Sequence, residues 1–240
     1  MSEELKSNLA RKMIDAKIRN QCVILRRYTR NGSIDTEKEI LAMQNLRGKL
    51  LFCKSVEEIM GYEGAAARIY FSTLGKLIDS EFTFSGRNKR PPLDPFNSMI
   101  SLGYSIILNE IYGKLEGKGL NPYFGILHKD REKHPTLASD MMEEWRAVLI
   151  DTLVMGMLNG HELSKENFYR DSESGAVLLD KEGFKKYIGK LENKFHADQK
   201  YLSYIDYRGS FRRALDLQVN QLAKAIEEND ASLYMPVVIR

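Results

Sequence analysis

The first 30 residues predict one long helix, and the length of this helix constrains the dimensions of the fold. The stretch SEELKSNLARKMIDAKIRNQCVILRRYT opens with Ser2 as a helix N-cap, and Asn31 with Gly32 supplies the stop signal. Strand signals are nearly absent from the rest of the chain. We therefore predict an all-α fold, a single multi-helix domain over residues 1–240, with further helices over residues 34–50, 55–60, 63–78, 97–115, 137–158, 184–195 and 210–228.

Two segments interrupt the helical pattern. The stretch SEFTFSGRNKRPPLDP contains Pro91, Pro92 and Pro95, which forbid a regular helix there. Residues 166–180 mix turn signals with one short extended piece at 176–179, so we expect a surface excursion from the helical domain.

The composition is that of a soluble globular protein, with 43% hydrophobic and 29% charged residues. No apolar run approaches the roughly 20 residues that a membrane helix needs. No signal peptide opens the chain. Cys22 and Cys53 both lie in apolar contexts and are expected to be buried free thiols. These features predict a cytoplasmic protein with no membrane partner.

Basic residues gather in three places, although the net charge of +3 does not by itself demand a nucleic acid. A cluster of this kind is more often a solvated face than a binding site. Three clusters in one chain nevertheless favour a polyanionic partner. The first cluster lies on one helix face and contains Lys12, Arg19, Arg26 and Arg30. The second lies in GRNKRPP and contains Arg87, Lys89 and Arg90. The third lies in YRGSFRR and contains Arg208, Arg212 and Arg213.

One glutamate stands in a segment of small and apolar residues, GYEGAAARIYFSTLG. A carboxylate removed from water costs several kcal/mol unless a positive charge compensates it. Glu63 therefore faces solvent, meets an arginine or holds a metal ion. The segment alone leaves these three alternatives open.

A histidine and two further carboxylates complete a set of potential metal ligands. His128 follows the apolar stretch YFGIL, and Asp140 and Glu143 are three residues apart on one face of a predicted helix. Carboxylates with an imidazole suit a divalent ion, and the imidazole favours Mn²⁺ over Mg²⁺. Acidic pairs on helices are usually solvated, so the spacing alone is weak evidence.

Several motifs in one order give a stronger indication: GYEGAAARIYF, GRNKRPPLDPFNSMISLGY, GLNPYFGILH, LASDMMEEWR and LLDKEGFKKYI. With these motifs together, the chain resembles the CRISPR-associated integrase, the metal-dependent nuclease subunit of the spacer-acquisition machinery. The resemblance covers nearly the whole chain, with Trp145 at a position where phenylalanine is usual. Members of that family generally carry an N-terminal β-domain, whereas this sequence starts at the first helix of the helical lobe.

The resemblance assigns roles to the four candidate residues. Glu63 matches the family's first metal-binding carboxylate, and His128 matches its metal-binding histidine. Asp140 and Glu143 match the acidic positions of the last motif. The resemblance thus implies a catalytic site for Mn²⁺ or Mg²⁺ at these four residues. Asp140 would either complete the metal shell or orient a water molecule or the histidine.

The resemblance also implies an activity and partners. The family joins spacer DNA to a repeat array by transesterification, in which a 3′-hydroxyl attacks a phosphodiester; with water as the attacker, the site would act as an endonuclease. His128 must be neutral to bind a metal, so activity should fall below about pH 6. The residues expected to contact DNA phosphates are Arg19, Arg26, Arg30, Arg87 and Arg90.

The implied partners are DNA, both spacer precursor and repeat, and a small ferredoxin-like CRISPR adaptation protein. The full-length form of the family is expected to be a homodimer. Two alternatives remain open from the sequence. One is a related integrase of a mobile element, and the other is a non-catalytic helical module for DNA binding or assembly.

Overall fold

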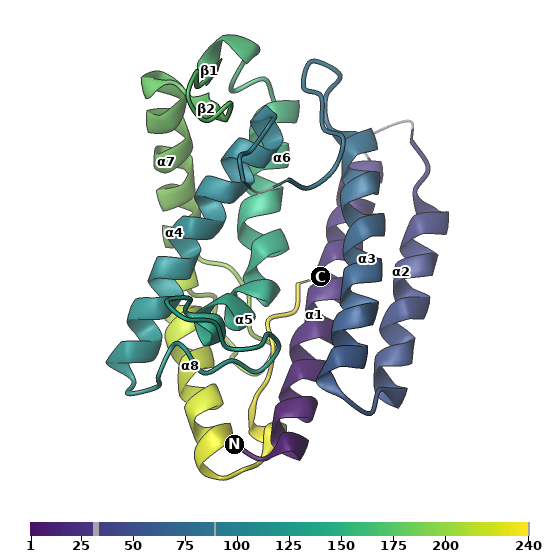
Figure 1. Ribbon diagram of the computed structural model, residues 1–240, viewed down its shortest axis with the longest axis vertical. Coiled ribbons are helices and arrows are strands. Elements are labelled where there is room, and N and C mark those ends of the chain that lie inside the picture. Colours follow the sequence, from purple (N-terminus) through teal and green to yellow (C-terminus); the bar gives the residue numbers. More distant parts are fainter. Residues whose placement is uncertain (31–33, 89, 240) are drawn as a thin grey trace.

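Helices make up nearly all of the regular secondary structure, as the sequence predicts (Figure 1). The computed structural model describes residues 1–30, 34–88 and 90–239. The predicted helix stop at Asn31 and Gly32, and Lys89 of the second basic cluster, lie outside these ranges. The helices are α1 (Glu3–Thr29), α2 (Glu37–Lys49), α3 (Val56–Leu77), α4 (Pro95–Gly117), α5 (Thr136–Trp145), α6 (Thr152–Asn159), α7 (Lys181–His196) and α8 (Phe211–Glu227).

Short irregular elements join these helices. A π-helical stretch, η2 (Arg146–Asp151), continues α5 into α6, and three 3₁₀ turns lie at Leu50–Phe52, Lys165–Asn167 and Ala231–Leu233. The predicted surface excursion is a small antiparallel hairpin of β1 (Phe168–Arg170) and β2 (Val177–Leu179), in which Tyr169 pairs with Leu178. The all-α class predicted from the sequence is therefore confirmed.

Side-chain caps explain where several helices begin. Ser2 accepts a hydrogen bond from the Leu5 N–H at 3.2 Å, so this predicted N-cap is confirmed. Ser55 caps α3 by accepting from the Glu58 N–H at 3.3 Å. Asp94 caps α4 at 2.8 Å, directly after the proline-rich segment that separates α3 from α4. Each cap satisfies a backbone donor that has no partner inside the helix.

The third helix corrects one expectation. Residues 55–60 and 63–78 were expected to form separate helices, but α3 runs without a break through Gly61 and Gly64. A Cβ atom added at either glycine meets nothing within 4 Å, so neither is required for close packing. Gly103 of α4 does lie in close packing, because an added Cβ would lie 2.3 Å from the Tyr187 hydroxyl.

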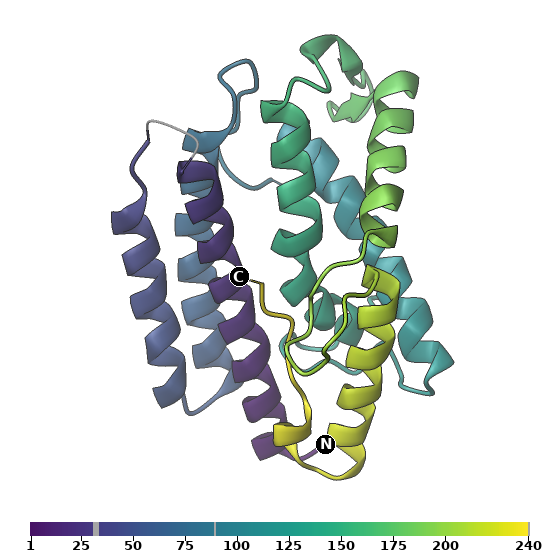
Figure 2. The ribbon, with the colours of Figure 1, turned by 180° about the vertical axis from the view of Figure 1, so that it is seen from behind.

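The helices form two groups that share one core. Helices α1, α2 and α3 lie side by side, with α2 antiparallel to the other two, and α4 to α8 form the second group (Figures 1 and 2). α5 and η2 pack against α1 and connect the groups. The C-terminal segment after α8 lies beside α1 in both views. This arrangement brings α1, α3 and α5 together around the candidate site.

Two expectations drawn from the composition can be compared with the structure. Cys22 and Cys53 are buried free thiols, as predicted. Of the helices in the described ranges, none combines the length and the apolar character that would be needed to cross a membrane.

Candidate metal centre

One cavity of about 710 Å³ brings together three of the four predicted metal-site residues. Glu63 reaches it from α3, Glu143 from α5, and His128 from the loop between α4 and α5. The segment after α3 forms another wall. The basic side chains that line the same cavity are Lys17, Arg68, Lys76, Arg87 and Arg146. The cavity therefore combines a potential cation site with an excess of positive charge.

The two carboxylates of the cavity share one ammonium group. Lys17 of α1 donates to Glu63 Oε1 and, at 2.6 Å, to Glu143 Oε2. Lys17 is 7% exposed and Glu143 is 4% exposed. The sequence left solvent, an arginine or a metal ion open for Glu63, and the structure gives it a cationic partner that is a lysine rather than an arginine.

Glu143 is held in its ionised form by two cations. Burial alone would raise its pKa, but Arg146 and Lys17 outweigh burial and lower the pKa to about 2. Arg146 contacts the other carboxylate oxygen of Glu143, Oε1, at 3.0 Å. Arg146 therefore pairs with the glutamate three residues before it. Glu143 carries its charge throughout the neutral range and remains a potential metal ligand.

Asp140 is completely buried behind His128, and it does not line the cavity. Its Oδ2 accepts from the backbone N–H groups of Ile126 and Leu127 at 2.6 and 2.8 Å. Its Oδ1 lies 2.6 Å from Nδ1 of His128. The carboxylate thus engages the loop that carries the histidine, which is the arrangement of a group that orients a ligand.

The contact with Asp140 fixes the chemistry of His128. Because Nδ1 faces a carboxylate, it carries the proton, and Nε2 is the ring nitrogen left to bind a metal. The same hydrogen bond raises the pKa of His128 above its ordinary value of 6.5, because it favours the imidazolium form. Gly125 makes the tight loop possible, since an added Cβ would lie 2.7 Å from the His128 carbonyl oxygen.

Two arginines are built into the wall of the cavity beside the carboxylates. The guanidinium groups of Arg87 and Arg146 lie 5.6 and 4.9 Å from the centre of the Tyr104 ring. Asn97 further fixes Arg87 at 2.8 Å. The Tyr104 hydroxyl donates to Asp151 at 2.5 Å, and burial raises the pKa of this carboxyl to about 6. The arginines are therefore positioned before any anion binds.

Of the predicted DNA contacts, the structure places Arg87 in the cavity and the others elsewhere. Arg19, Arg26 and Arg30 lie between about 180° and 220° around α1 from Lys17, at 100° per residue, and so face away from the site. Arg26 also lies 3.8 Å from Glu37. Arg90 is exposed in the segment before α4.

Two other members of the basic clusters have structural partners. Lys12 donates to the carbonyl oxygens of Ala231 and Tyr234 at 2.6 and 2.8 Å. Arg212 pairs with Glu110 at 2.8 Å and with Glu192 at 3.0 Å.

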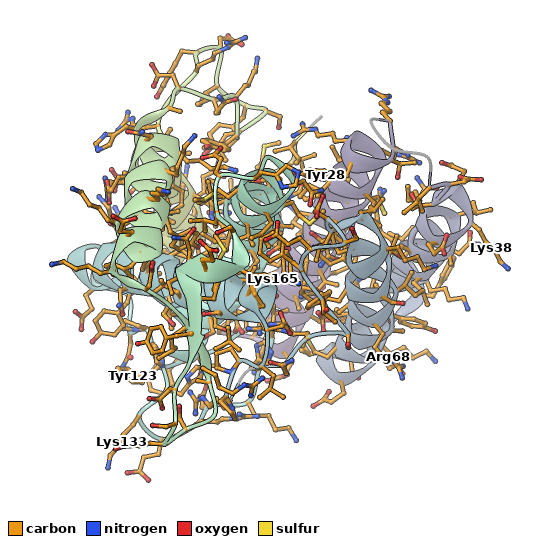
Figure 3. All side chains as sticks on the ribbon, turned by 90° about the horizontal axis from the view of Figure 1, so that it is seen from above. Tyr28, Lys38, Arg68, Tyr123, Lys133 and Lys165 are labelled. Carbon is orange, nitrogen blue, oxygen red and sulfur yellow. The ribbon has the colours of Figure 1, made fainter. Side chains whose placement is uncertain are left out.

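Lys17 and Arg68 are cavity residues that the sequence reasoning missed. Lys17 gave a readable signal, because it interrupts the buried stripe of α1 that includes Met13 and Ile24. A lysine in such a stripe needs a buried anionic partner. Arg68 gave no comparable signal. Arg68 lies on α3, as the view from above shows (Figure 3).

The donor set fits a divalent metal ion. Glu63, Glu143 and His128 line one cavity, and the histidine has a carboxylate behind it. Among the described residues, the group whose ligand atoms lie within 4.8 Å of one another is Asp79, Glu81 and His161, beyond the end of α3, so the ligand atoms of Glu63, Glu143 and His128 are farther apart. The His161 side chain is 64% exposed, and it lies outside the cavity.

The fold is thus a helical domain in which two carboxylates and a histidine line a cavity beside fixed arginines, as in a metal-dependent enzyme that acts on phosphate groups. The chain belongs to the Cas1 family: residues 1–193 match the family described as CRISPR associated protein Cas1. The family resemblance read from the sequence motifs is thereby confirmed.

Curated relatives agree with this assignment. The chain is 38% identical over 236 residues to a CRISPR-associated endonuclease Cas1 of Mycobacterium tuberculosis (strain CDC 1551 / Oshkosh), covering 97% of this chain and 68% of the relative. It is 33% identical to a CRISPR-associated endonuclease Cas1 of Thermus thermophilus, covering 97% of this chain and 67% of the relative. The chain thus spans about two thirds of the length of these relatives.

Solved structures share the fold. A chain of a Cas6-RT-Cas1--Cas2 complex matches with a TM-score of 0.86 and 25% identity, over 98% of this chain and 25% of that one. A casposase bound to integration product matches with a TM-score of 0.83 and 25% identity, over 95% of this chain and 63% of that one.

Proposed function

We propose that the chain is the catalytic helical lobe of a divalent-metal-dependent DNA endonuclease and integrase of CRISPR adaptation. It would join spacer DNA 3′-hydroxyls to a repeat array by transesterification. The observation that carries the proposal is the position of Glu63, Glu143 and His128 around one cavity, beside fixed arginines. Membership of the Cas1 family supports the same conclusion.

The proposed ligands of Mn²⁺ or Mg²⁺ are Glu63, Glu143 and His128, with Asp140 as the group that orients the histidine. When bound, the ion would polarise the phosphoryl oxygen and stabilise the charge that develops during the attack. Asp140 holds the proton on Nδ1, so that Nε2 of His128 stays available.

The arginines of the cavity would bind the phosphate group. Arg87 and Arg146 are held against the Tyr104 ring, so their positive charges are in place before the DNA arrives. Arg68 adds a charge at the exposed side of the cavity. We also propose that DNA phosphates farther from the reacting one are contacted by Arg19, Arg26, Arg30 and Arg90.

Partners are inferred from the relatives. One matched structure is titled as a complex of Cas1 with Cas2, which supports a second, small adaptation protein as a partner. A ferredoxin-like fold for that protein, and a homodimer of the full-length family form, are parts of the same proposal.

A second candidate function is that of an integrase of a mobile element. The match to a casposase bound to integration product favours it, since it covers 95% of this chain. Both functions would use the same residues and the same phosphate chemistry. They differ in the DNA target, so a repeat-containing target and a random target separate them.

The test is a strand-transfer assay on branched DNA in Mn²⁺, run with the wild type, Glu63→Gln and His128→Asn. Each variant should lose at least about 100-fold in rate, because each removes a proposed ligand. Glu57→Gln is the matched control, since Glu57 lies on the same helix but is exposed and outside the cavity. Product formation that survives chelation, or Glu63→Gln with wild-type rates, would refute the proposal. DNA binding without product would favour a non-catalytic module.

A further inference from the structure

Lys17 occupies the position between the two carboxylates of the candidate metal centre. Its Nζ contacts Oε1 of Glu63 and Oε2 of Glu143. Among the residues that the structure describes, it alone forms ion pairs with both carboxylates. All three side chains are buried or nearly so, which makes the ammonium part of the site rather than a surface charge.

An ammonium group and a divalent ion compete for these two carboxylates. A divalent ion bound between Glu63 and Glu143 would lie close to the Lys17 ammonium, and two neighbouring cations repel strongly in a buried site. Glu63 and Glu143 balance the charges of Lys17 and Arg146 in the present arrangement. A divalent ion added to this neutral group would leave an excess of two positive charges.

We propose that Lys17 is an internal counter-cation that fills the carboxylate pair in the metal-free protein and leaves it when a divalent ion binds. The inference rests on the proposed function, because it takes Glu63 and Glu143 to be metal ligands. Lys17 would thus set how much free metal the site requires. It would also keep the two buried carboxylates compensated when no metal is present.

The structure explains why Lys17, and not Arg146, is the group that leaves. Arg146 uses the other oxygen of Glu143, Oε1, and its guanidinium is packed on the Tyr104 ring. Lys17 carries its charge on a flexible stem with four methylene groups, and it lines a cavity of about 710 Å³ into which the ammonium can turn. The exchange therefore needs a side-chain rotation and no movement of α1.

Calorimetric titration with Mn²⁺ tests the exchange. Lys17→Met keeps the stem and removes the charge, so it should bind Mn²⁺ at least about tenfold more tightly than the wild type. Lys76→Met is the matched control, because Lys76 lines the same cavity but pairs with Glu39 at 2.8 Å. It should bind Mn²⁺ like the wild type.

Thermal unfolding gives a second readout. In chelator, Lys17→Met should melt below the wild type, since two largely buried carboxylates lose their shared partner. Saturating Mn²⁺ should raise the melting temperature of this variant more than that of the wild type.

The outcomes separate this inference from the proposed function. Equal or weaker Mn²⁺ binding by Lys17→Met, with binding abolished by Glu63→Gln, would overturn the role of Lys17 and leave the metal site standing. Failure of every protein to bind Mn²⁺ would overturn both. Binding by Lys17→Met alone would support the inference, because the lysine would then block the site in the wild type.

A measurement on the wild type removes any dependence on how the variants fold. Acetic anhydride labelling followed by peptide mapping should find Lys17 protected in chelator and labelled several-fold faster in saturating Mn²⁺. Lys76, which is already half-exposed, should be labelled equally in both conditions. Lys17 that stays protected when Mn²⁺ is bound would overturn the inference.

Discussion

At the scale of single residues, the pairing of His128 with Asp140 decides what each acidic group can do. The sequence left two roles open for Asp140, as a ligand or as an orienting group. In the structure its oxygens accept from the loop backbone and face Nδ1 of His128. The orienting role is therefore the one that the geometry favours.

This pairing predicts how metal binding depends on pH. Because Asp140 raises the pKa of His128 above 6.5, Mn²⁺ affinity should fall as the pH drops through a midpoint above 6.5, higher than the value of about 6 expected from the sequence. Asp140→Asn should move the midpoint down toward 6.5 and weaken binding at pH 8 by about 10- to 100-fold. Calorimetry at several pH values measures both effects. An unchanged midpoint in Asp140→Asn would show that the carboxylate does not control the histidine.

At the scale of helices, α3 shows that glycine does not always mark a break or a close contact. Gly61 lies inside the helix, yet an added Cβ there meets nothing within 4 Å. Gly103 lies inside α4, where an added Cβ would come within 2.3 Å of the Tyr187 hydroxyl and 2.7 Å of a methyl group of Ile150. The two glycines look alike in the sequence and differ in what surrounds them.

Alanine at these two positions should therefore have opposite effects. Gly61→Ala should raise the free energy of unfolding by about 0.5–1 kcal/mol, because it restricts the unfolded chain at no steric cost. Gly103→Ala should lower it by about 1–3 kcal/mol through overpacking. Urea unfolding measures both, and each variant serves as the other's control. A stabilising Gly103→Ala would mean that α4 and α7 can move apart.

At the scale of the whole molecule, the C-terminal segment joins the two groups of helices. Asn20 of α1 donates to the Val237 carbonyl at 2.9 Å and accepts from the Ile239 N–H at 3.0 Å. Glu144 of α5 accepts from the Val237 N–H at 2.8 Å and from the Tyr234 hydroxyl at 2.6 Å. Glu144 directly follows Glu143, so this segment also braces the helix that carries the candidate metal ligand.

Loss of the Asn20 side chain should loosen this connection. Asn20→Ala leaves the Val237 carbonyl without its side-chain donor in a buried place, which should cost about 1–3 kcal/mol of unfolding free energy. Hydrogen exchange should quicken at the Val237 and Ile239 amides, and urea unfolding should show the loss. Arg19→Ala, at the exposed neighbouring position, should stay within about 0.5 kcal/mol of the wild type. Unchanged exchange in Asn20→Ala would show that Glu144 and the core hold the segment alone.

The helical class could be predicted from the sequence alone, and so could several helix starts and, through ordered motifs, the family and four candidate site residues. These properties depend on local signals, such as the Ser2 cap, and on motif order, which can be read along the chain. Only the tertiary structure placed Lys17 between Glu63 and Glu143, which lie 46 and 126 residues away. Helix periodicity fixes which residues share a face, but the packing of one helix against another decides which faces meet.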